Sequence, residues 1–510
     1  MNSFDVVIVG AGHNGLVAAC YLAKAGKKVL VLEANSEVGG ASVSTQAFTG
    51  FDARISSYSY LVSLLPDKII SDLNLNFECI SRKVSSYTPY SKNGKDDGLL
   101  INRTWDKSNV ESFNRLTGSN NESDNWQRFY DEVSKFARIV APTLLAPLPT
   151  RSELKAKLNN DQIWSMLIEQ PFGETLDQYF TDDLVKGIVL TDALIGTFSS
   201  AYEIQANICF LYHLIGNGSG EWKVPKGGMG VLVDELYKLA LDLGVEIRVN
   251  SKVKSIKAGQ HLVEIVLENQ EKLTGNFLLS NAAPQVLAKL QGDTPPKSLE
   301  GSQIKINMLL ARLPKFKSGV DAKDAFVGTL HINETFSQLE KAYNQAKSGV
   351  LPEELPFEMY CHSLSDPSVL SPELSQNGYH TLTLFGIHTP ANLFDENAEQ
   401  IKQLAKERAL LAINKYLLEP IEDCLARDSD GQLCIEVKSP LDLEKEIALP
   451  RGNIFHKDLS FPFKEDDSTM KWGVETAHPR VFLCGAGAVR GGGVSGIAGH
   501  NAAMALLELS

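Results

Sequence analysis

The chain lacks the residue patterns that several functional classes require. Its seven cysteines include no Cys-x-x-Cys pair, which excludes a redox thiol pair of the disulfide-reductase kind and offers no metal-ligand spacing. Basic residues are outnumbered, with 49 Lys and Arg against 62 Asp and Glu and a net charge of −13, which argues against nucleic acid as the main partner. No apolar run reaches the roughly 18 residues of a membrane-spanning helix.

The odd number and wide spacing of the cysteines indicate a reducing compartment. The N-terminus enters an apolar segment almost at once, which leaves no room for a targeting peptide. We therefore expect a cytoplasmic protein that has no metal site. At 510 residues the chain is too long for a single ordinary core, so it predicts two or more domains.

What the chain does contain is a glycine motif, "GAGHNG", at residues 10–15. It follows the β-branched run "VVIV", which is typical of a buried parallel strand, and it leads into an apolar helical pattern. Gly10 allows a tight turn, Gly12 allows close approach to a pyrophosphate, and Gly15 allows the helix to pack on the strand. A second strand then ends at Glu33, whose carboxylate suits the two ribose hydroxyls of an adenosine. The order of these elements predicts a dinucleotide site and disfavours NADP.

A second glycine pair, Gly39 and Gly40, lies directly after this unit. It would let another loop approach the same pyrophosphate. This extension resembles FAD enzymes of the glutathione reductase-like and amine oxidase-like groups more than NAD dehydrogenases, so we expect FAD.

In the rest of the chain, segments that predict helices alternate with segments that predict strands. A predicted helix with leucines at 232, 236, 239 and 243 is followed by "VEIRV", "KVKSI", "HLVEIVLE" and "KLTGNFLLSN", which predict strands. "RVFLCGAG" predicts a late strand and "GIAGHNAAMALLEL" a closing helix. Residues 51–220 are expected to be largely helical, with a polar mobile patch at "TGSNNESDN", and residues 300–450 to mix strands with helices.

These patterns predict an α/β protein in which a glutathione reductase-like Rossmann FAD-binding domain is interrupted by a mixed α+β substrate domain. The predicted FAD-binding domain comprises 1–75, 221–295 and 450–510. The predicted substrate or cap domain comprises 76–220 and 296–449.

Four motifs stand in the order found in one family: "GAGHNGLVAA", "KGGMGVLVDEL", "LPRGNIFH" and "LCGAGAVRGGGVSGIAGHNAA". With these the chain resembles the carotenoid/retinoid oxidoreductase family, which includes phytoene desaturases. It also resembles the branch of pyridine nucleotide-disulfide oxidoreductase domain-containing protein 2, over nearly its whole length. The resemblance implies FAD and redox chemistry on a carbon skeleton, with one set of cofactor-binding residues: Gly10, Gly12, Gly15, Glu33, Gly40, Ala41, Val253, Ala282, Gly485, Gly492, Gly493 and Val494.

Several residues have two interpretations. Arg490 replaces a residue of the family pattern and would either lie near the flavin or turn to solvent. His456 is a catalytic candidate because its titration range suits proton transfer, but a packing role in a turn is favoured. Tyr58 and Tyr60 line a pocket or, as the favoured alternative, pack in the core. "NICFLYHLIG" lines a substrate tunnel or, again favoured, is a buried helix.

The function that these patterns favour is an FAD-dependent oxidoreductase acting on carbon–carbon bonds of an apolar or isoprenoid-like substrate, with an unidentified electron acceptor or donor. The alternatives are a flavin amine oxidase-like enzyme for a polar amine and a non-catalytic flavoprotein that acts as a scaffold or regulator. A weak membrane contact through "RIVAPTLLAPLPT" is a further alternative, disfavoured by the lack of a basic face.

Overall fold

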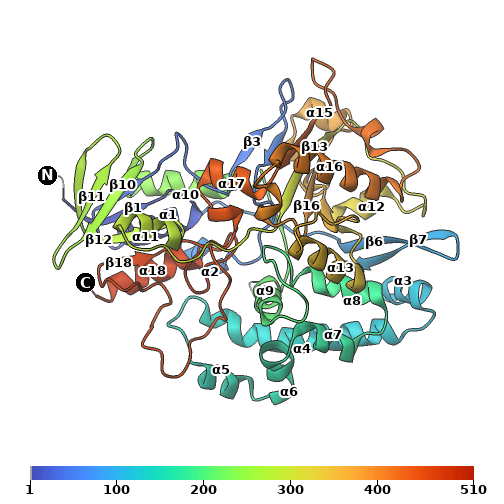
Figure 1. The fold of residues 1–510 in the computed structure, drawn as a ribbon, viewed down its shortest axis with the longest axis horizontal. Coiled ribbons are helices and arrows are strands. Elements are labelled where there is room, and N and C mark those ends of the chain that lie inside the picture. Colours follow the sequence, from blue (N-terminus) through green and yellow to red (C-terminus); the bar gives the residue numbers. More distant parts are fainter. Residues whose placement is uncertain (1–2, 217, 510) are drawn as a thin grey trace.

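The computed structural model describes residues 3–216 and 218–509. One sheet is built on parallel strands (Figure 1). In spatial order these strands are β18 (Val481–Leu483), β12 (Lys272–Ser280), β1 (Ser3–Val9), β2 (Val29–Leu32) and β9 (Glu246–Arg248). They come from three distant stretches of sequence, and their β-branched runs are buried as central parallel strands require.

Two further strands extend this sheet as an antiparallel meander. β10 (Val253–Ala258) pairs with β11 (Val263–Leu267), and β11 pairs with the first half of β12. The second half of β12 pairs with β1 and β18. The three successive strands predicted after residue 250 are thereby confirmed.

Helices cover both faces of the sheet. Side chains of β1 alternate between two cores, with Val6 and Ile8 on one face and Val7 and Val9 on the other. The first face packs against three helices, namely α1 (His13–Lys24), α10 (Gly230–Asp242) and α18 (Ile497–Leu507). The second face packs against α11 (Pro284–Gln291). This arrangement confirms the predicted α/β class with a Rossmann-type nucleotide-binding part, and α1 begins at His13, inside the glycine motif.

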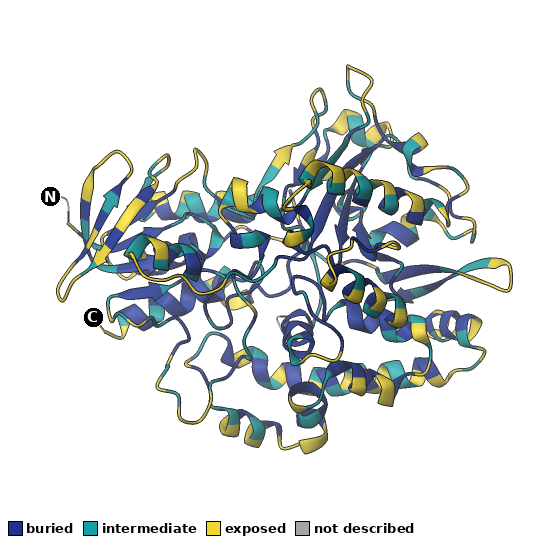
Figure 2. Ribbon diagram, in the orientation of Figure 1, coloured by how far each residue is buried: buried dark blue, intermediate teal, exposed yellow. Residues whose placement is uncertain are grey.

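A second sheet lies beside the first (Figure 1). Its order is β17 (Ile435–Lys438), β13 (Ile304–Leu310), β16 (His380–Gly386), β15 (Phe357–Tyr360), β14 (Thr329–Ile332), β6 (Val84–Lys92) and β7 (Lys95–Asn102). The central strands of both sheets are buried, whereas β10, at one edge of the first sheet, and the tip of the β6–β7 hairpin carry exposed residues (Figure 2). This hairpin is an exception to the expectation that residues 51–220 are largely helical, which holds for residues 107–215, where helices follow one another.

Helices surround the second sheet and form a layer beneath it (Figure 1). The lower layer contains α3 (Lys107–Thr117), α4 (Asn121–Val140), α5 (Arg151–Leu158), α6 (Asp161–Trp164), α7 (Phe172–Tyr179), α8 (Asp183–Thr191) and α9 (Ile204–Ile215). The other α-helices of the described residues are α2 (Asp67–Leu73), α12 (Ala322–Val327), α13 (Phe336–Lys347), α14 (His362–Ser365), α15 (Pro372–Gln376), α16 (Ala398–Asn414) and α17 (Pro440–Ile447). Shorter strands are β3 (Ser44–Gln46), β4 (Arg54–Ser56), β5 (Cys79–Ile80) and β8 (Val224–Pro225).

The polar patch "TGSNNESDN" forms the junction of α3 and α4. Gly118 ends α3 in the left-handed conformation, and α4 begins at Asn121. The polar residues from Asn121 onward form the first turns of α4, and the predicted mobility of the patch stays a prediction. Within residues 3–216 and 218–509, no helix is both long and apolar enough to cross a membrane. The predicted domain boundaries stay a prediction.

Candidate functional site

A cavity of about 600 Å³ begins where the parallel strands of the first sheet end. Gly10 follows β1, Glu33 follows β2 and Ala282 follows β12, and all three line it. The carboxyl ends of parallel strands meet at one edge of a sheet, which is where α/β proteins bind ligands. The same cavity continues to Tyr60 and Phe385, so it joins the nucleotide-binding sheet to the second sheet.

The glycine turn is held against the second glycine pair. Gly12 and Gly39 form a parallel bridge, and the Gly39 N–H donates to the carbonyl of Ala11 over 2.9 Å. A Cβ on Gly15 would lie 2.3 Å from the Gly10 carbonyl oxygen, so no side chain fits there. The first N–H groups of α1 have no partner within the helix, and they stand next to the cavity-lining residues Gly12 and His13. This geometry suits a bound pyrophosphate.

Glu33 is buried and holds the turn in shape. One carboxylate oxygen accepts the Ala11 N–H at 2.8 Å, and the other accepts the Asn35 N–H at 2.9 Å. A carboxylate accepts about four hydrogen bonds, so Glu33 retains acceptor capacity toward the cavity that it lines. Its predicted role toward ribose hydroxyls stays a prediction.

Asn281 was missed by sequence reasoning, although it immediately precedes the predicted Ala282. Its side-chain amide donates to the Gly10 carbonyl over 3.3 Å, and it lines the cavity beside Ala282. A Cβ on Gly12 would come within 2.8 Å of this amide. The motif "SNAAP" was the available signal, because a polar residue at a strand end next to a glycine turn satisfies its carbonyls.

The structure separates the other predicted cofactor residues into two groups. Gly40, Ala41, Val253, Gly493 and Val494 line the cavity. Gly15, Gly485 and Gly492 are not among its lining residues.

Those that do not line it pack against its walls. A Cβ on Gly485 would lie 2.5 Å from the carbonyl oxygen of Asn281, and one on Gly492 would lie 2.5 Å from Leu459. Their lack of a side chain therefore permits close packing. Among the predicted glycines of this C-terminal segment, Gly493, with φ of +72°, is the one that lines the cavity.

Two histidines border the cavity without full hydrogen bonding. His13 Nε2 and His456 Nδ1 are buried and have no partner. Burial lowers the pKa of each to about 4, so both are neutral at neutral pH. A neutral imidazole with this pKa is a weak base, which favours the packing interpretation of His456. Its backbone φ of +65° and its carbonyl, which accepts from Gln285, place it in a tight turn.

Arg490 is turned inward. Its side chain is 1% exposed, so the solvent-directed alternative was wrong. The guanidinium donates to the carbonyl oxygens of Thr143 at 2.6 Å, Ala146 at 2.8 Å and Trp472 at 2.9 Å. Burial lowers its pKa to about 10, which leaves it charged at neutral pH. It is not among the cavity-lining residues, and its visible role is to join separate loops.

The inner part of the cavity is walled by aromatic and apolar side chains. Tyr60 packs against Phe385 with ring centroids 5.4 Å apart, and His213 stacks on Trp222 at 5.1 Å. Tyr58 also lines the cavity, so the favoured core-packing interpretation of Tyr58 and Tyr60 was incomplete.

The predicted segment "NICFLYHLIG" forms most of α9. This helix is buried, and its Tyr212 and His213 line the cavity, so both interpretations of the segment hold.

The cavity wall also contains a buried lysine, Lys305, which lies on strand β13. It is 4% exposed, and its amine donates to the carbonyls of Ser56 at 2.6 Å and Tyr58 at 2.8 Å. Burial lowers its pKa to about 7. A buried amine with a strongly perturbed pKa in a cavity marks a functional position. The sequence carried no signal for it beyond a lysine within an apolar strand.

The residues present fit a dinucleotide cofactor that carries a ring system. The glycine turn, Gly40 and Gly493 leave room for close contact, because no side chain projects from them. Asn14 Oδ1, His13 Nε2 and His456 Nδ1 are buried polar atoms without partners in a cavity that all three residues line. Buried polar atoms are rarely left unpaired, so these atoms match a bound polar ligand.

Comparison with known proteins agrees with this geometry. Residues 8–63 match the model of the NAD(P)-binding Rossmann-like domain, and residues 77–401 match that of flavin containing amine oxidoreductases. An uncharacterised protein of Mycobacterium tuberculosis is 41% identical over 99% of this chain and 97% of its own length. Pyridine nucleotide-disulfide oxidoreductase domain-containing protein 2 of Mus musculus is 30% identical, with 98% and 92% covered.

More distant proteins share the architecture. Prolycopene isomerase of Daucus carota is 25% identical over 84% of this chain and 69% of its own. A solved putrescine oxidase variant has a TM-score of 0.60 at 17% identity and covers 100% of this chain and 99% of its own, a likeness in fold alone.

The fold and the site define a flavoprotein oxidoreductase that uses FAD. The chain belongs to the flavin containing amine oxidoreductase family. The predicted likeness to pyridine nucleotide-disulfide oxidoreductase domain-containing protein 2 is confirmed at the level of homology.

Proposed function

We propose that this enzyme oxidises or reduces a carbon–carbon bond of an extended apolar substrate, of the isoprenoid type. The observation that carries the proposal is the chemistry of the inner cavity. Among the described residues that line it, the carboxylates are Glu33 and Glu446. Glu33 is engaged by backbone N–H groups of the glycine turn, and Glu446 is exposed and paired with Lys438.

A cationic amine substrate would therefore find no free carboxylate near Lys305, Tyr60 and Phe385. The charged group present there is itself an amine, and it would repel such a substrate when protonated. Aromatic and aliphatic walls instead favour apolar surface. The carotenoid/retinoid assignment suggested by the motifs and by the carrot prolycopene isomerase is kept here as a proposal for the substrate class.

FAD supplies the acceptance or donation of a hydride when it is bound. The chain supplies binding, orientation and a site for a proton. Neutral Lys305 uses its two N–H groups on the carbonyls of Ser56 and Tyr58 and keeps one lone pair. With a pKa of about 7 it can take up or release a proton near neutral pH. Tyr60, Tyr212 and Phe385 form walls that exclude water from the reacting bond.

The test is anaerobic. FAD-loaded protein is mixed with polyenes, retinoids, fatty acyl compounds and small polar amines, and flavin absorbance is followed for reduction, or for reoxidation after chemical reduction. We expect a response to an apolar unsaturated or saturated chain. A response to polar amines alone would overturn the proposal in favour of an amine oxidase. No response to any member, together with no turnover with artificial electron acceptors, would favour a non-catalytic flavoprotein.

The cytoplasmic location is likewise proposed, on the grounds that all seven cysteines are free. The disfavoured membrane contact gains no support from the structure. The segment "RIVAPTLLAPLPT" buries its large apolar side chains at Val140, Leu144 and Leu148, so they are not available to a lipid surface.

A further inference from the structure

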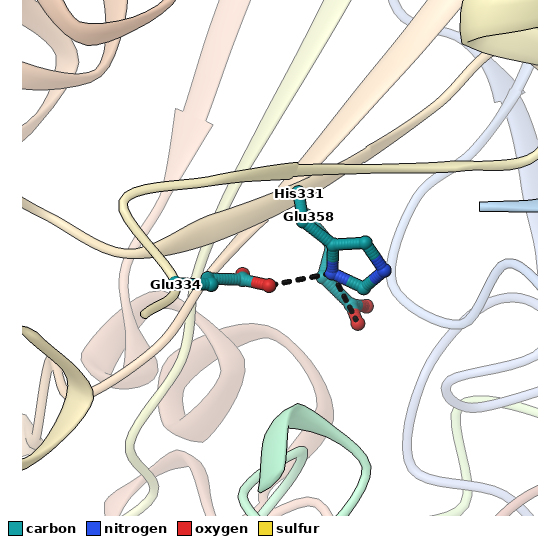
Figure 3. A group of neighbouring side chains, drawn as sticks. All are labelled: His331, Glu334 and Glu358. Atoms are coloured by element: carbon teal, nitrogen blue, oxygen red, sulfur yellow. Dashed lines mark hydrogen bonds and ion pairs between the residues drawn. The ribbon is translucent and has the colours of Figure 1, made fainter. Parts of the chain in front are cut away.

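A cluster of buried ionisable side chains lies outside the cavity, where β14, β15 and α8 meet. His331 Nδ1 lies 2.5 Å from a carboxylate oxygen of Glu334 and 3.8 Å from one of Glu358 (Figure 3). All three residues are buried. At the far end of the cluster, Thr191 of α8 donates to the same oxygen of Glu334 over 3.0 Å.

This cluster is connected to the cavity wall. The hydroxyl of Tyr360 donates to Glu358. The ring of Tyr360 packs against that of Tyr60 with centroids 4.8 Å apart, and the Tyr360 side chain also interacts with the Tyr60 phenol. Tyr60 lines the cavity, and the Lys305 amine lies 5.2 Å from the centre of its ring. A continuous row of polar side chains therefore leads from the cavity into the interior.

The charges around the row do not balance if every acid is ionised. Arg82 is buried above the Tyr360 ring, with its guanidinium 5.7 Å from the ring centre, and it donates to Thr329 and to the carbonyl of Trp222. Against this cation stand three carboxyls, those of Glu334, Glu358 and the neighbouring Asp192. Ionised carboxylates in a buried region are costly unless each is paired. The row must therefore retain protons.

The direction of each pKa agrees with this conclusion. Burial, helped by nearby Glu334, raises the pKa of Glu358 to about 8, and burial raises that of Asp192 to about 6. Burial also raises the pKa of Glu334 well above its ordinary value and lowers that of His331. At neutral pH Glu358 thus holds a proton, Asp192 is mostly ionised, and the imidazole of His331 lies close enough to Glu334 to share a proton with it.

A metal ion is the other occupant that such residues suggest. Two ligand atoms on one zinc ion, each about 2.1 Å from it in a tetrahedral site, would be roughly 3.4 Å apart. The Nδ1–Oε2 separation of 2.5 Å is that of a short hydrogen bond instead. The hydroxyls of Thr191 and Tyr360 also donate hydrogen bonds to the carboxyl groups of Glu334 and Glu358. These hydrogen bonds are compatible with a proton shared between His331 and Glu334.

We propose that Tyr360, Glu358, His331 and Glu334 form a buried proton reservoir that exchanges a proton with the cavity through Tyr60 when the bound FAD changes its redox state. Oxidation of a substrate at carbon removes two electrons and two hydrogens. One hydrogen leaves with the electron pair to FAD, and the other leaves as a proton that needs an acceptor. Lys305 accepts that proton at the cavity wall, and the row takes it over through Tyr60 onto the neutral imidazole of His331, which lies between Glu334 and Glu358, and returns it in the reverse direction. A small rotation of Glu358 closes the 3.8 Å gap to His331. This inference rests on the proposed function only for the source of the proton.

Infrared difference spectroscopy of the FAD-loaded full chain, oxidised against dithionite-reduced, tests the reservoir without any substrate. We expect reduction to change a carbonyl band of a protonated carboxyl, and Glu358→Gln to remove that change. The matched control is Glu122→Gln, since Glu122 is 2% exposed and accepts the Thr181 N–H in the helical layer away from the row. This control should keep the band change. In FAD-free protein, the same band should titrate near pH 8 and be lost in Glu358→Gln.

If Glu358→Gln does not fold, Tyr360→Phe keeps the ring and removes the hydroxyl that contacts Glu358, and it should shift the band. The reservoir would be overturned if the wild type showed no band change, or if the band change in Glu358→Gln and in Tyr360→Phe were the same as in the wild type. Either result would leave the substrate proposal intact. About one metal ion per chain that co-purifies and is lost in Glu334→Gln would also overturn it, in favour of a cation site.

Discussion

The guanidinium of Arg490 donates to the carbonyl oxygen of Thr143 over 2.6 Å and so ties the C-terminal glycine segment to the turn after α4. Ala146 and Trp472 supply further carbonyl acceptors from separate loops. The single buried cation supplies donors to the carbonyls of Ala146 and Trp472, whereas the Thr143 carbonyl also accepts the N–H of Ala146.

Removal of this cation should therefore destabilise the fold. Arg490→Ala removes the guanidinium donor of the Ala146 and Trp472 carbonyls, and each unsatisfied carbonyl costs about 1–3 kcal/mol, so we expect a loss of roughly 2 kcal/mol or more in the free energy of unfolding. Chemical denaturation measures it. Arg427→Ala is the control, since Arg427 is exposed and should change stability by no more than about 0.5 kcal/mol. Equal stabilities of the two variants would contradict the role of Arg490.

Glu33→Gln should weaken FAD binding by about 1–3 kcal/mol, because a charged acceptor is lost and the new NH₂ group faces backbone N–H groups of Ala11 or Asn35. The fold should survive. Fluorescence titration of FAD-free protein with FAD gives the affinity. Glu37→Gln, at an exposed position of the same loop, should bind FAD as the wild type does. An unchanged affinity in Glu33→Gln would show that Glu33 does not hold the cofactor.

Lys305 should make the free energy of unfolding depend on pH in a way that is absent from Lys305→Met. Burial lowers the pKa of the amine from 10.5 in the unfolded chain to about 7. Between these values the unfolded chain binds the extra proton, so the free energy of unfolding rises with pH from about 7 to 10.5 relative to Lys305→Met. Denaturation at several pH values measures this difference, and a difference that falls with pH would be the wrong sign.

The rate of flavin reduction by substrate should also rise with pH through about 7, if the neutral amine accepts the proton. Lys305→Arg keeps a positive charge that cannot be lost near neutrality. It should therefore lower the rate at all pH values and abolish this rise. A rate profile unchanged by Lys305→Arg would remove Lys305 from the chemistry.

The thiols should take no part in turnover. Six of the seven cysteines are buried, and burial raises the pKa of Cys20 to about 12 and that of the half-buried Cys79 to about 11. The reactive thiolate is therefore scarce at neutral pH. Iodoacetamide treatment of folded protein at pH 7 should leave flavin reduction intact. A loss of flavin reduction in proportion to the alkylation of one thiol would contradict this prediction.

FAD should be bound without a covalent link. No cysteine is among the described residues that line the cavity, and its histidines stand in buried, neutral positions, His13 and His456 with pKa values of about 4. Heat-denatured protein should release a yellow supernatant. A colourless supernatant over a yellow precipitate would show a covalent bond.

The first 40 residues were largely predictable from the sequence. A buried strand, three glycines, a helix and Glu33 act on one another at short range, and the periodicity of apolar residues identifies each element. The strands of the β10–β12 meander were predictable for the same reason. Burial of polar residues was not. Arg490 contacts a carbonyl 347 positions away, and no local pattern signals such a partner.

The substrate end of the cavity was decided by tertiary structure alone. Tyr60, Tyr212, Lys305 and Phe385 come from four distant segments and meet only because the second sheet and α9 pack against the nucleotide-binding sheet. Lys305 lies in a strand whose apolar pattern indicates a core. Its pKa and its place at the cavity depend on the desolvation that the surrounding fold imposes. The sequence by itself predicted an FAD site at the edge of the first sheet, whereas packing between distant segments decided which side chains line the rest of the cavity, because those contacts join residues far apart in the chain.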